Sequence, residues 1–148
     1  MRVDYLSPIL GKHMDVSHAP DDTFQAYMLG VGFVIFPDDN KIYSPTDGVV
    51  SLIFPTKHAI AVKHASGIQI LIHLGFGTVD LKGEGITLHV ELHQHVKQGD
   101  LLLSFDFDFL SKNALSLATP VVFLQNKHLT ILKEEIINQK LYMQLEIS

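Results

Sequence analysis

The feature that most constrains the fold is a succession of short apolar or alternating segments separated by turn residues. The intervening turns are rich in Gly, Pro, Asp and Asn, as in PDDN and TDG, which favour tight reversals of the chain. Many short strands at close spacing are typical of an antiparallel β-sandwich or barrel. We therefore predict an all-β fold with little helix, its strands carried by GFVIFP, GVVSLIFP, HAIAVKH, GIQILIHL, DLLLSFDF and TPVVFL.

Helix is expected at two places only. FDFLSKNALSLA (107–118) and TILKEEIINQK (130–140) could each form a turn or two.

No internal repeat, low-complexity tract or linker-like run divides the chain. Since 148 residues are enough to bury a core, residues 1–148 are expected to form one domain.

Composition narrows the class of protein. There is no cysteine, the N-terminus lacks the apolar core of a signal peptide, and no apolar run reaches the length of a membrane span. These features fit a cytoplasmic protein. A net charge of −5 without a basic stripe argues against nucleic acid as the main partner. Nine histidines are many for this length, so histidine chemistry and metal binding are the hypotheses to weigh.

His73 ends an otherwise apolar strand and precedes a glycine-rich loop. With a period of two, Ile68, Ile70, Ile72 and Leu74 share a uniformly apolar face, which should point into a core. The other face carries Leu71 and His73, is mixed, and should be at least partly wet. His73 is therefore expected to project from a rigid strand toward the surface.

His58 is the second candidate, at the start of the HAIAVKH strand. The alternation of side chains along a strand places His58 on the same face as the apolar Ile60 and Val62, although a bend after Pro55 could turn its side chain elsewhere. The two strands are joined by a short turn, and neighbouring strands lie about 5 Å apart, so His58 and His73 can approach one ligand. Two such imidazoles suit phosphoryl transfer or zinc ligation. The alternative is two unrelated histidines.

The segment HVELHQH holds His89, His93 and His95, and His-x-His is a spacing found among zinc ligands. It leads into the polar turn VKQGD, which favours a solvated surface loop. The other histidines show no partner pattern and are interpreted as surface or structural residues: His13, His18, His64 and His128. The glycines of GVGFVIF precede a strand, so neither a Rossmann nor a P-loop site is predicted.

Taken together, several motifs resemble the glucose-type enzyme IIA domains of the bacterial phosphoenolpyruvate:sugar phosphotransferase system. They are SPILG, the block from Phe24 to Pro37, SPTDGVVSLIFPTKHA, LIHLGFGTVDLKGEG, VKQGDLLLSFD and TPVV, in the expected order over residues 7–126. The resemblance implies an antiparallel β-sandwich with a shallow apolar active face and no tightly bound cofactor. Residues 127–148 match weakly and receive no role.

The resemblance also implies site residues and partners. His73 would accept a phosphoryl group on Nε2 from the carrier protein HPr and pass it to a cysteine of a IIB domain, part of a sugar permease at the membrane. His58 would stabilise the phosphoryl oxygens, and Thr56 would orient His58. The docking surface would comprise Phe24, Met28, Phe54, Leu71 and Val79.

Two positions depart from the family pattern. Val31 and Gly77 stand where family members usually carry acids that meet a basic partner. This leaves open a IIA-like regulatory protein that docks on other proteins through the same face, with phosphorylation as its switch. A lysostaphin-like zinc hydrolase and a purely structural β domain are further alternatives; the hydrolase would need a His-x-x-x-Asp motif as well as His-x-His. The start at Met1, just ahead of SPILG, favours a stand-alone protein.

Overall fold

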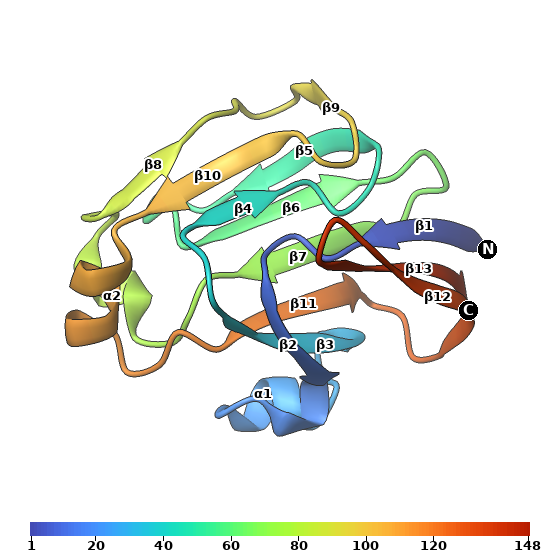
Figure 1. Cartoon of the computed structure of the whole chain (residues 1–148), viewed down its shortest axis with the longest axis horizontal. Helices are drawn as coiled ribbons and strands as arrows, with labels where there is room; N and C mark the ends of the chain where they lie inside the picture. Colours follow the sequence, from blue (N-terminus) through green and yellow to red (C-terminus); the bar gives the residue numbers. More distant parts are fainter.

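Thirteen antiparallel strands form three sheets in the computed structural model, which describes residues 1–148 (Figure 1). The largest sheet has seven strands in the order β2-β3-β11-β7-β6-β5-β9. Its bounds are β2 Gly11–Asp15, β3 Gly30–Pro37, β11 Thr119–Leu124, β7 Gln69–His73, β6 Ala59–Lys63, β5 Gly48–Ile53 and β9 His95–Val96.

Two smaller sheets complete the fold. One has the order β4-β10-β8 and the other β1-β13-β12. The first and last parts of the chain therefore share a sheet, and Figure 1 shows both termini at the same side of the molecule. The bounds are β4 Lys41–Tyr43, β10 Leu101–Phe105, β8 Ile86–Leu88, β1 Arg2–Leu6, β13 Lys140–Ile147 and β12 Leu129–Ile137.

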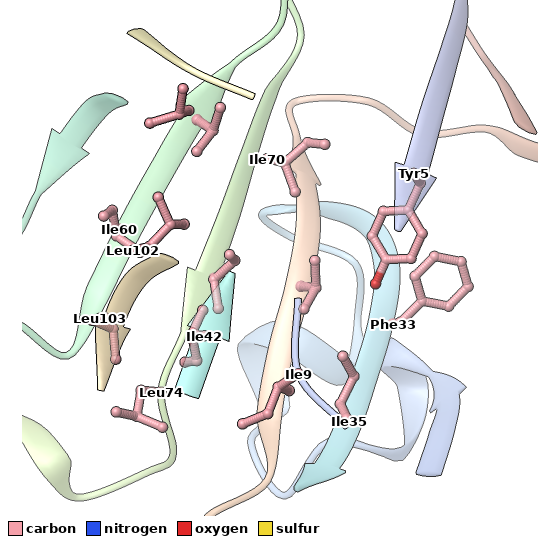
Figure 2. Close-up of a cluster of buried hydrophobic side chains, with 14 of the residues drawn as sticks. Tyr5, Ile9, Phe33, Ile35, Ile42, Ile60, Ile70, Leu74, Leu102 and Leu103 are labelled. Carbon is pink, nitrogen blue, oxygen red and sulfur yellow. The ribbon is translucent and has the colours of Figure 1, made fainter. Parts of the chain in front are cut away.

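The main core lies between the seven-stranded sheet and the two smaller ones. Figure 2 shows Ile60 and Ile70 from the large sheet, together with Ile42 and Leu102 from the β4–β10 pair and Tyr5 from β1. The period-two prediction for β7 is confirmed, because every residue of its apolar face is buried in this cluster: Ile68, Ile70, Ile72 and Leu74. The prediction of an all-β sandwich is confirmed as well.

A second, smaller apolar cluster covers part of the opposite face of the seven-stranded sheet. Ala59 and Ala61 of β6 lie beside Leu71 of β7, and Phe24 from α1 (Asp22–Gln25) covers them with η1 (Val16–His18). The two alanines leave room above the sheet. The larger side chains of β7 and α1 occupy this space, and His73 stands at its edge.

One of the two helix predictions is confirmed. Residues 107–113 form α2 (Phe107–Asn113), capped by the Asp106 side chain, which accepts a hydrogen bond from the Phe109 amide. The only other helical turn outside the N-terminal region is η2 (Thr78–Leu81). No helix has the length and apolar character needed to cross a bilayer.

The second helix prediction is wrong, since residues 129–137 form strand β12. This strand pairs along its length with β13, and a bulge between Ile131 and Lys133 shifts the register. The bulge changes the side-chain parity on either side of Leu132. The sequence pattern therefore loses the simple alternation of a strand and takes on a helix-like spacing.

Candidate active site

The pairing of β6 with β7 brings His58 and His73 together. Ala59 lies opposite His73 in the register, so the residue before Ala59 is adjacent to the end of β7. The two imidazole centroids are 4.9 Å apart and the rings are nearly perpendicular, at 84°. The predicted proximity of His58 and His73 is thus found in the structure.

The side chain of His58 does not follow the parity of β6. Phe54 and Ala59 close the β5–β6 connection by a backbone hydrogen bond, and Lys57 within it has a left-handed φ of 62°. This tight turn re-aims His58 away from Ile60 and Val62, which enter the main core. The bend after Pro55, left open by the sequence, is therefore what brings His58 to His73.

The tautomer of His73 follows from one hydrogen bond. Its Nδ1 lies 2.8 Å from the carbonyl oxygen of Gly75, and a carbonyl can only accept, so Nδ1 carries the proton. The lone pair then resides on Nε2. Nε2 makes no hydrogen bond within the chain. Every buried side-chain nitrogen of the protein does make one, so Nε2 is accessible to solvent.

Gly75 and Gly77 shape the loop that follows His73. Both have left-handed φ values, 68° and 74°, and a Cβ on Gly75 would lie 2.6 Å from the carbonyl oxygen of Ser116. Only glycine permits this close approach. The loop therefore folds back over the end of β7 and places the Gly75 carbonyl beside His73.

Thr56 lies beside His58, as predicted. Its hydroxyl is 2.5 Å from Nδ1 of His58. When the hydroxyl donates this bond, the proton of His58 is on Nε2, which has no partner in the chain and can donate to an oxyanion. His58 is only 4% exposed, so the ring is held with little more than its reactive edge uncovered.

The site favours neutral imidazoles. Burial, with a smaller contribution from the neighbouring His58, lowers the pKa of His73 to about 4, although the Gly75 carbonyl and the charge of Asp21 oppose the shift. Burial also lowers the pKa of His58. A neutral imidazole has a free lone pair, which a nucleophile requires.

Aromatic rings surround the pair. Phe24 lies 5.3 Å from His73 and Phe76 lies 5.5 Å from it, measured between ring centroids, and Phe54 lies 5.3 Å from His58. Phe76 was not predicted from the sequence, since a bridge to Ser116 decides its position. The Asp21 side chain accepts a hydrogen bond from the Phe24 amide and caps α1.

The five predicted docking residues do not form one exposed surface. Met28 and Val79 are exposed, at 68% and 48%, and Phe54 is half-buried. Phe24 and Leu71 are buried, at 6% and 5%. The expectation that the Leu71 face is wet is therefore wrong at Leu71, because α1 and its neighbours cover it; Phe24 and Leu71 support the surface from beneath.

The two positions that depart from the family pattern lie in different parts of the fold. Val31 is half-buried in β3. A Cβ on Gly77 would lie 2.7 Å from Cγ of Leu115, whose side chain is 88% exposed. An apolar side chain thus covers the position at which an acid was expected.

The remaining histidines lie apart from the pair. HVELHQH is a surface segment: His89 bonds to Ser104, His93 has a left-handed φ of 71°, and His95 is exposed in β9. His13 is a structural residue whose Nε2 lies 3.0 Å from the Tyr5 hydroxyl.

No three histidine or carboxylate side chains are grouped so as to hold a metal ion together. The ligand set of a lysostaphin-like hydrolase is not assembled. A zinc ion at His58 and His73 would have two ligands from this chain, fewer than the three or four usual for zinc.

The arrangement suits transfer of a phosphoryl group. One neutral imidazole offers a lone pair at a solvent-accessible Nε2, and a second, oriented by a hydroxyl, can donate to the charge that develops on the transferred group. Both are held by hydrogen bonds to groups of the chain itself, Gly75 and Thr56. Fixed donors of this kind need little rearrangement during reaction.

Comparison with known proteins agrees with this chemistry. The chain is 46% identical over 119 residues to the glucosamine-specific EIICBA component of the phosphotransferase system of Bacillus subtilis (strain 168), a match over 80% of this chain and 19% of that protein. The chain thus spans about a fifth of the length of this relative. Its fold is similar to glucose permease IIA from Mycoplasma capricolum, with a TM-score of 0.82 and 32% identity over 99% of this chain and 94% of the other.

The family comparison covers most of the chain. A family model described as phosphoenolpyruvate-dependent sugar phosphotransferase system, EIIA 1, matches residues 3–129. The match includes both histidines, Thr56 and every strand that positions them. The chain belongs to the EIIA 1 family of the phosphoenolpyruvate-dependent sugar phosphotransferase system.

Proposed function

We propose that this chain is a cytoplasmic phosphocarrier in which His73 accepts a phosphoryl group from phosphorylated HPr and passes it to a cysteine of a IIB domain. The observation that carries the proposal is the neutral His73 ring, with Nδ1 bonded to Gly75 and Nε2 free, beside His58 at 4.9 Å. Residues 1–148 would act as one IIA domain, and the membrane would be reached only through the permease partner.

The first half-reaction begins with the lone pair of His73 Nε2. It attacks the phosphorus of phosphorylated HPr, the P–N bond of the donor breaks, and its electron pair returns to the imidazole of HPr. His58 Nε2–H donates to a phosphoryl oxygen, and the Thr56 hydroxyl holds His58 in the tautomer that can do so. Positioning and charge stabilisation are sufficient, and no bound cofactor is required.

The second half-reaction reverses these roles. The thiolate of the IIB cysteine attacks phosphorus, the P–N bond to His73 breaks, and its electron pair returns to Nε2. His58 stays bonded to the phosphoryl oxygens as the group moves to sulfur. The IIB domain would then phosphorylate the incoming sugar.

The docking surface would be formed by the five residues named from the resemblance. Met28, which follows α1, and Val79, in η2, would supply exposed apolar area. Phe54 contributes its half-buried ring next to His58, and Phe24 and Leu71 hold the surface in shape. Exposed apolar groups near a reactive centre favour close approach of a partner, which excludes water during transfer.

The test follows the two transfers separately. The full chain is incubated with phosphoenolpyruvate, enzyme I and HPr, and the phosphoryl group is followed first onto the chain and then onto a purified IIB domain. The proposal predicts an acid-labile phosphoryl group on the chain that is discharged by IIB. Failure of HPr to phosphorylate the chain would contradict it.

One observation favours a second function. Leu115 covers Gly77, and Val31 replaces the other expected acid, so the rim of the site lacks two charges that would attract a basic partner. A IIA-like regulator that docks on other proteins through this face would need phosphorylation as a switch but not fast relay. Rapid transfer of the phosphoryl group from the chain to IIB would favour the carrier. A stable phosphoryl group, with a partner protein that binds the phosphorylated and unphosphorylated chain differently, would favour the regulator.

A further inference from the structure

The ring of His73 is enclosed by three other rings that come from three separate parts of the chain. Phe24 comes from α1, His58 from the turn before β6 and Phe76 from the loop after β7. Their planes make angles with the His73 plane of 59°, 84° and 34° in that order. Phe76 is therefore the neighbour whose face lies most nearly parallel to the imidazole.

The hydrogen bond to Gly75 leaves one motion of His73 unrestrained. It fixes which ring nitrogen faces the loop, but a single bond to a carbonyl permits the imidazole to tilt about that contact. A flat side chain alongside the ring resists such a tilt, because the tilted imidazole would collide with it. Phe76 has the orientation that this restraint requires.

Phe76 is itself held firmly. Its amide donates to the Ser116 carbonyl at 2.8 Å, and its carbonyl accepts from the Leu115 amide at 2.8 Å, which forms an isolated antiparallel bridge to Ser116. Its ring also packs edge-on against Phe24, 5.7 Å away at 81°. A loop residue pinned on both sides can act as a rigid wall.

We propose that Phe76 is a positioning residue, whose ring fixes the plane of the His73 imidazole so that Nε2 is presented to the incoming phosphoryl group. Phe76 touches neither donor nor acceptor in this role and acts only through His73. The inference rests on the proposed function for its kinetic consequence, but the restraint on the ring is a property of the unphosphorylated protein.

The kinetic test compares Phe76→Leu with Phe76→Tyr. Leucine keeps an apolar side chain but loses the flat face, whereas tyrosine keeps the ring. With HPr, enzyme I and phosphoenolpyruvate as the donor system, Phe76→Leu should lower the maximal rate of His73 phosphorylation by about 10-fold with little change in KM, because a small misplacement of a reacting atom is costly. Phe76→Tyr should stay within about threefold of the natural protein, because it keeps the flat face that holds the ring in place.

Phe109→Leu is the matched control. Phe109 is also partly buried, but it packs against the main core rather than against His73. Replacing its ring by leucine should therefore leave the phosphorylation rate unchanged. Circular dichroism checks that each variant folds, and Phe76→Met takes the place of Phe76→Leu if the latter does not. A normal rate in Phe76→Leu, an equal loss in Phe76→Tyr, or a change confined to KM would each overturn the proposal.

A second readout needs no donor. The ring nitrogens of His73 are observed by NMR at pH 8 in the unphosphorylated full chain. The natural protein and Phe76→Tyr should show one sharp set of ring signals with the proton on Nδ1, and Phe76→Leu should keep this tautomer but show ring signals broadened by the tilting motion. If HPr fails to phosphorylate any of the proteins, the proposed function fails, while this spectrum still decides the role of Phe76; equally sharp ring signals in Phe76→Leu would refute it.

Discussion

At the residue scale, the environment of one imidazole accounts for the chemistry assigned to it. His73 lies opposite a small residue, Ala59, so the ring has room above the sheet, and aromatic side chains then exclude water from its sides. The Gly75 carbonyl holds the proton on Nδ1. A reactive nitrogen results from ordinary groups arranged at the end of a strand.

The pH behaviour of His73 tests this environment. Burial lowers its pKa to about 4, from 6.5 in a solvated histidine. A nitrogen-detected titration of the folded protein should therefore have its midpoint near pH 4 for His73, and the same residue should titrate near 6.5 after unfolding in urea. A folded midpoint at or above 6.5 would contradict the burial argument.

The same shift has a consequence for stability. Because the folded pKa lies below the unfolded one, the unfolded chain binds more protons between these values. His73 therefore contributes its full stability above about pH 6.5, and this contribution is lost as the pH falls toward about 4. His13, whose pKa is lowered to about 4 by burial, acts in the same direction.

His58 and Thr56 should affect the two half-reactions unequally. His58→Gln keeps the nucleophile, so His73 should still accept a phosphoryl group from HPr. Transfer onward to IIB should slow by about 100-fold or more, since a positioned donor to the developing charge is lost. Both rates are measured separately by single-turnover transfer of labelled phosphate.

Two variants of Thr56 serve as controls for that assignment. Thr56→Val removes the hydroxyl bonded to His58 Nδ1 and should reproduce the His58→Gln pattern in weaker form. Thr56→Ser keeps a hydroxyl and should behave as the natural protein does. Equal slowing of both half-reactions in His58→Gln would reject the proposed division of roles.

The sequence predicted some of these residues well and others poorly, for physical reasons. The faces of β7 follow directly from its period of two, because side chains alternate strictly along a strand. His58 did not follow parity, since a turn with a left-handed Lys57 reorients it. Phe76 could not be placed, because its position depends on a bridge to Ser116, forty residues away in the sequence.

At the element scale, the β12–β13 hairpin shows how tertiary pairing overrides local pattern. β12 contains Ile131, Leu132, Ile136 and Ile137 with charged residues between them, a spacing compatible with a helical face. Its backbone groups pair instead with β13, which is anchored on its other side by β1. The prediction of helix failed because the pairing of this segment with β13, itself held by the distant β1, decides its conformation.

The turn of this hairpin carries a strain that can be removed. Asn138 and Gln139 have φ values of 50° and 68°, the left-handed conformation required at both positions of a tight hairpin turn. Asparagine tolerates it, whereas glutamine does not. Gln139→Gly should therefore raise the free energy of unfolding by about 0.5–1 kcal/mol.

Urea unfolding measures that change. The matched control is Gln144→Gly, in the interior of β13, where glycine should destabilise the protein because it weakens a strand. If Gln139→Gly proved neutral or destabilising, the turn would not have the geometry described.

At the scale of the whole molecule, the balance of charge around the site governs how partners approach. The chain has a net charge of −5, yet the rim positions 31 and 77 are uncharged, and Leu115 covers the second of them. Charged rims act mainly on association rate and on its salt dependence. Partner association should therefore depend on apolar contact more than on long-range attraction.

Restoring a rim acid should reveal this dependence. Gly77→Asp alone would force Leu115 aside, since the new Cβ lies 2.7 Å from Leu115 Cγ. Gly77→Asp is therefore combined with Leu115→Ala, which removes this contact, and aspartate adopts the left-handed φ of 74° more readily than most side chains do. This pair should be phosphorylated by HPr faster at low salt than Leu115→Ala alone, with a steeper loss of rate as salt rises. Identical rates and salt slopes would mean that the rim position is electrostatically idle, with Asp21, Asp22 and Asp80 supplying the charge that matters.

The measurement that tests the central claim most directly is identification of the phosphorylated atom. The chain is phosphorylated by HPr, enzyme I and phosphoenolpyruvate, and the modified nitrogen is identified by phosphorus and nitrogen NMR, with His73→Ala and the surface variant His93→Ala alongside. The account predicts a single phosphoryl group on Nε2 of His73, absent in His73→Ala and retained in His93→Ala. Phosphate on another histidine, on Nδ1 of His73, or still acquired by a folded His73→Ala would contradict it.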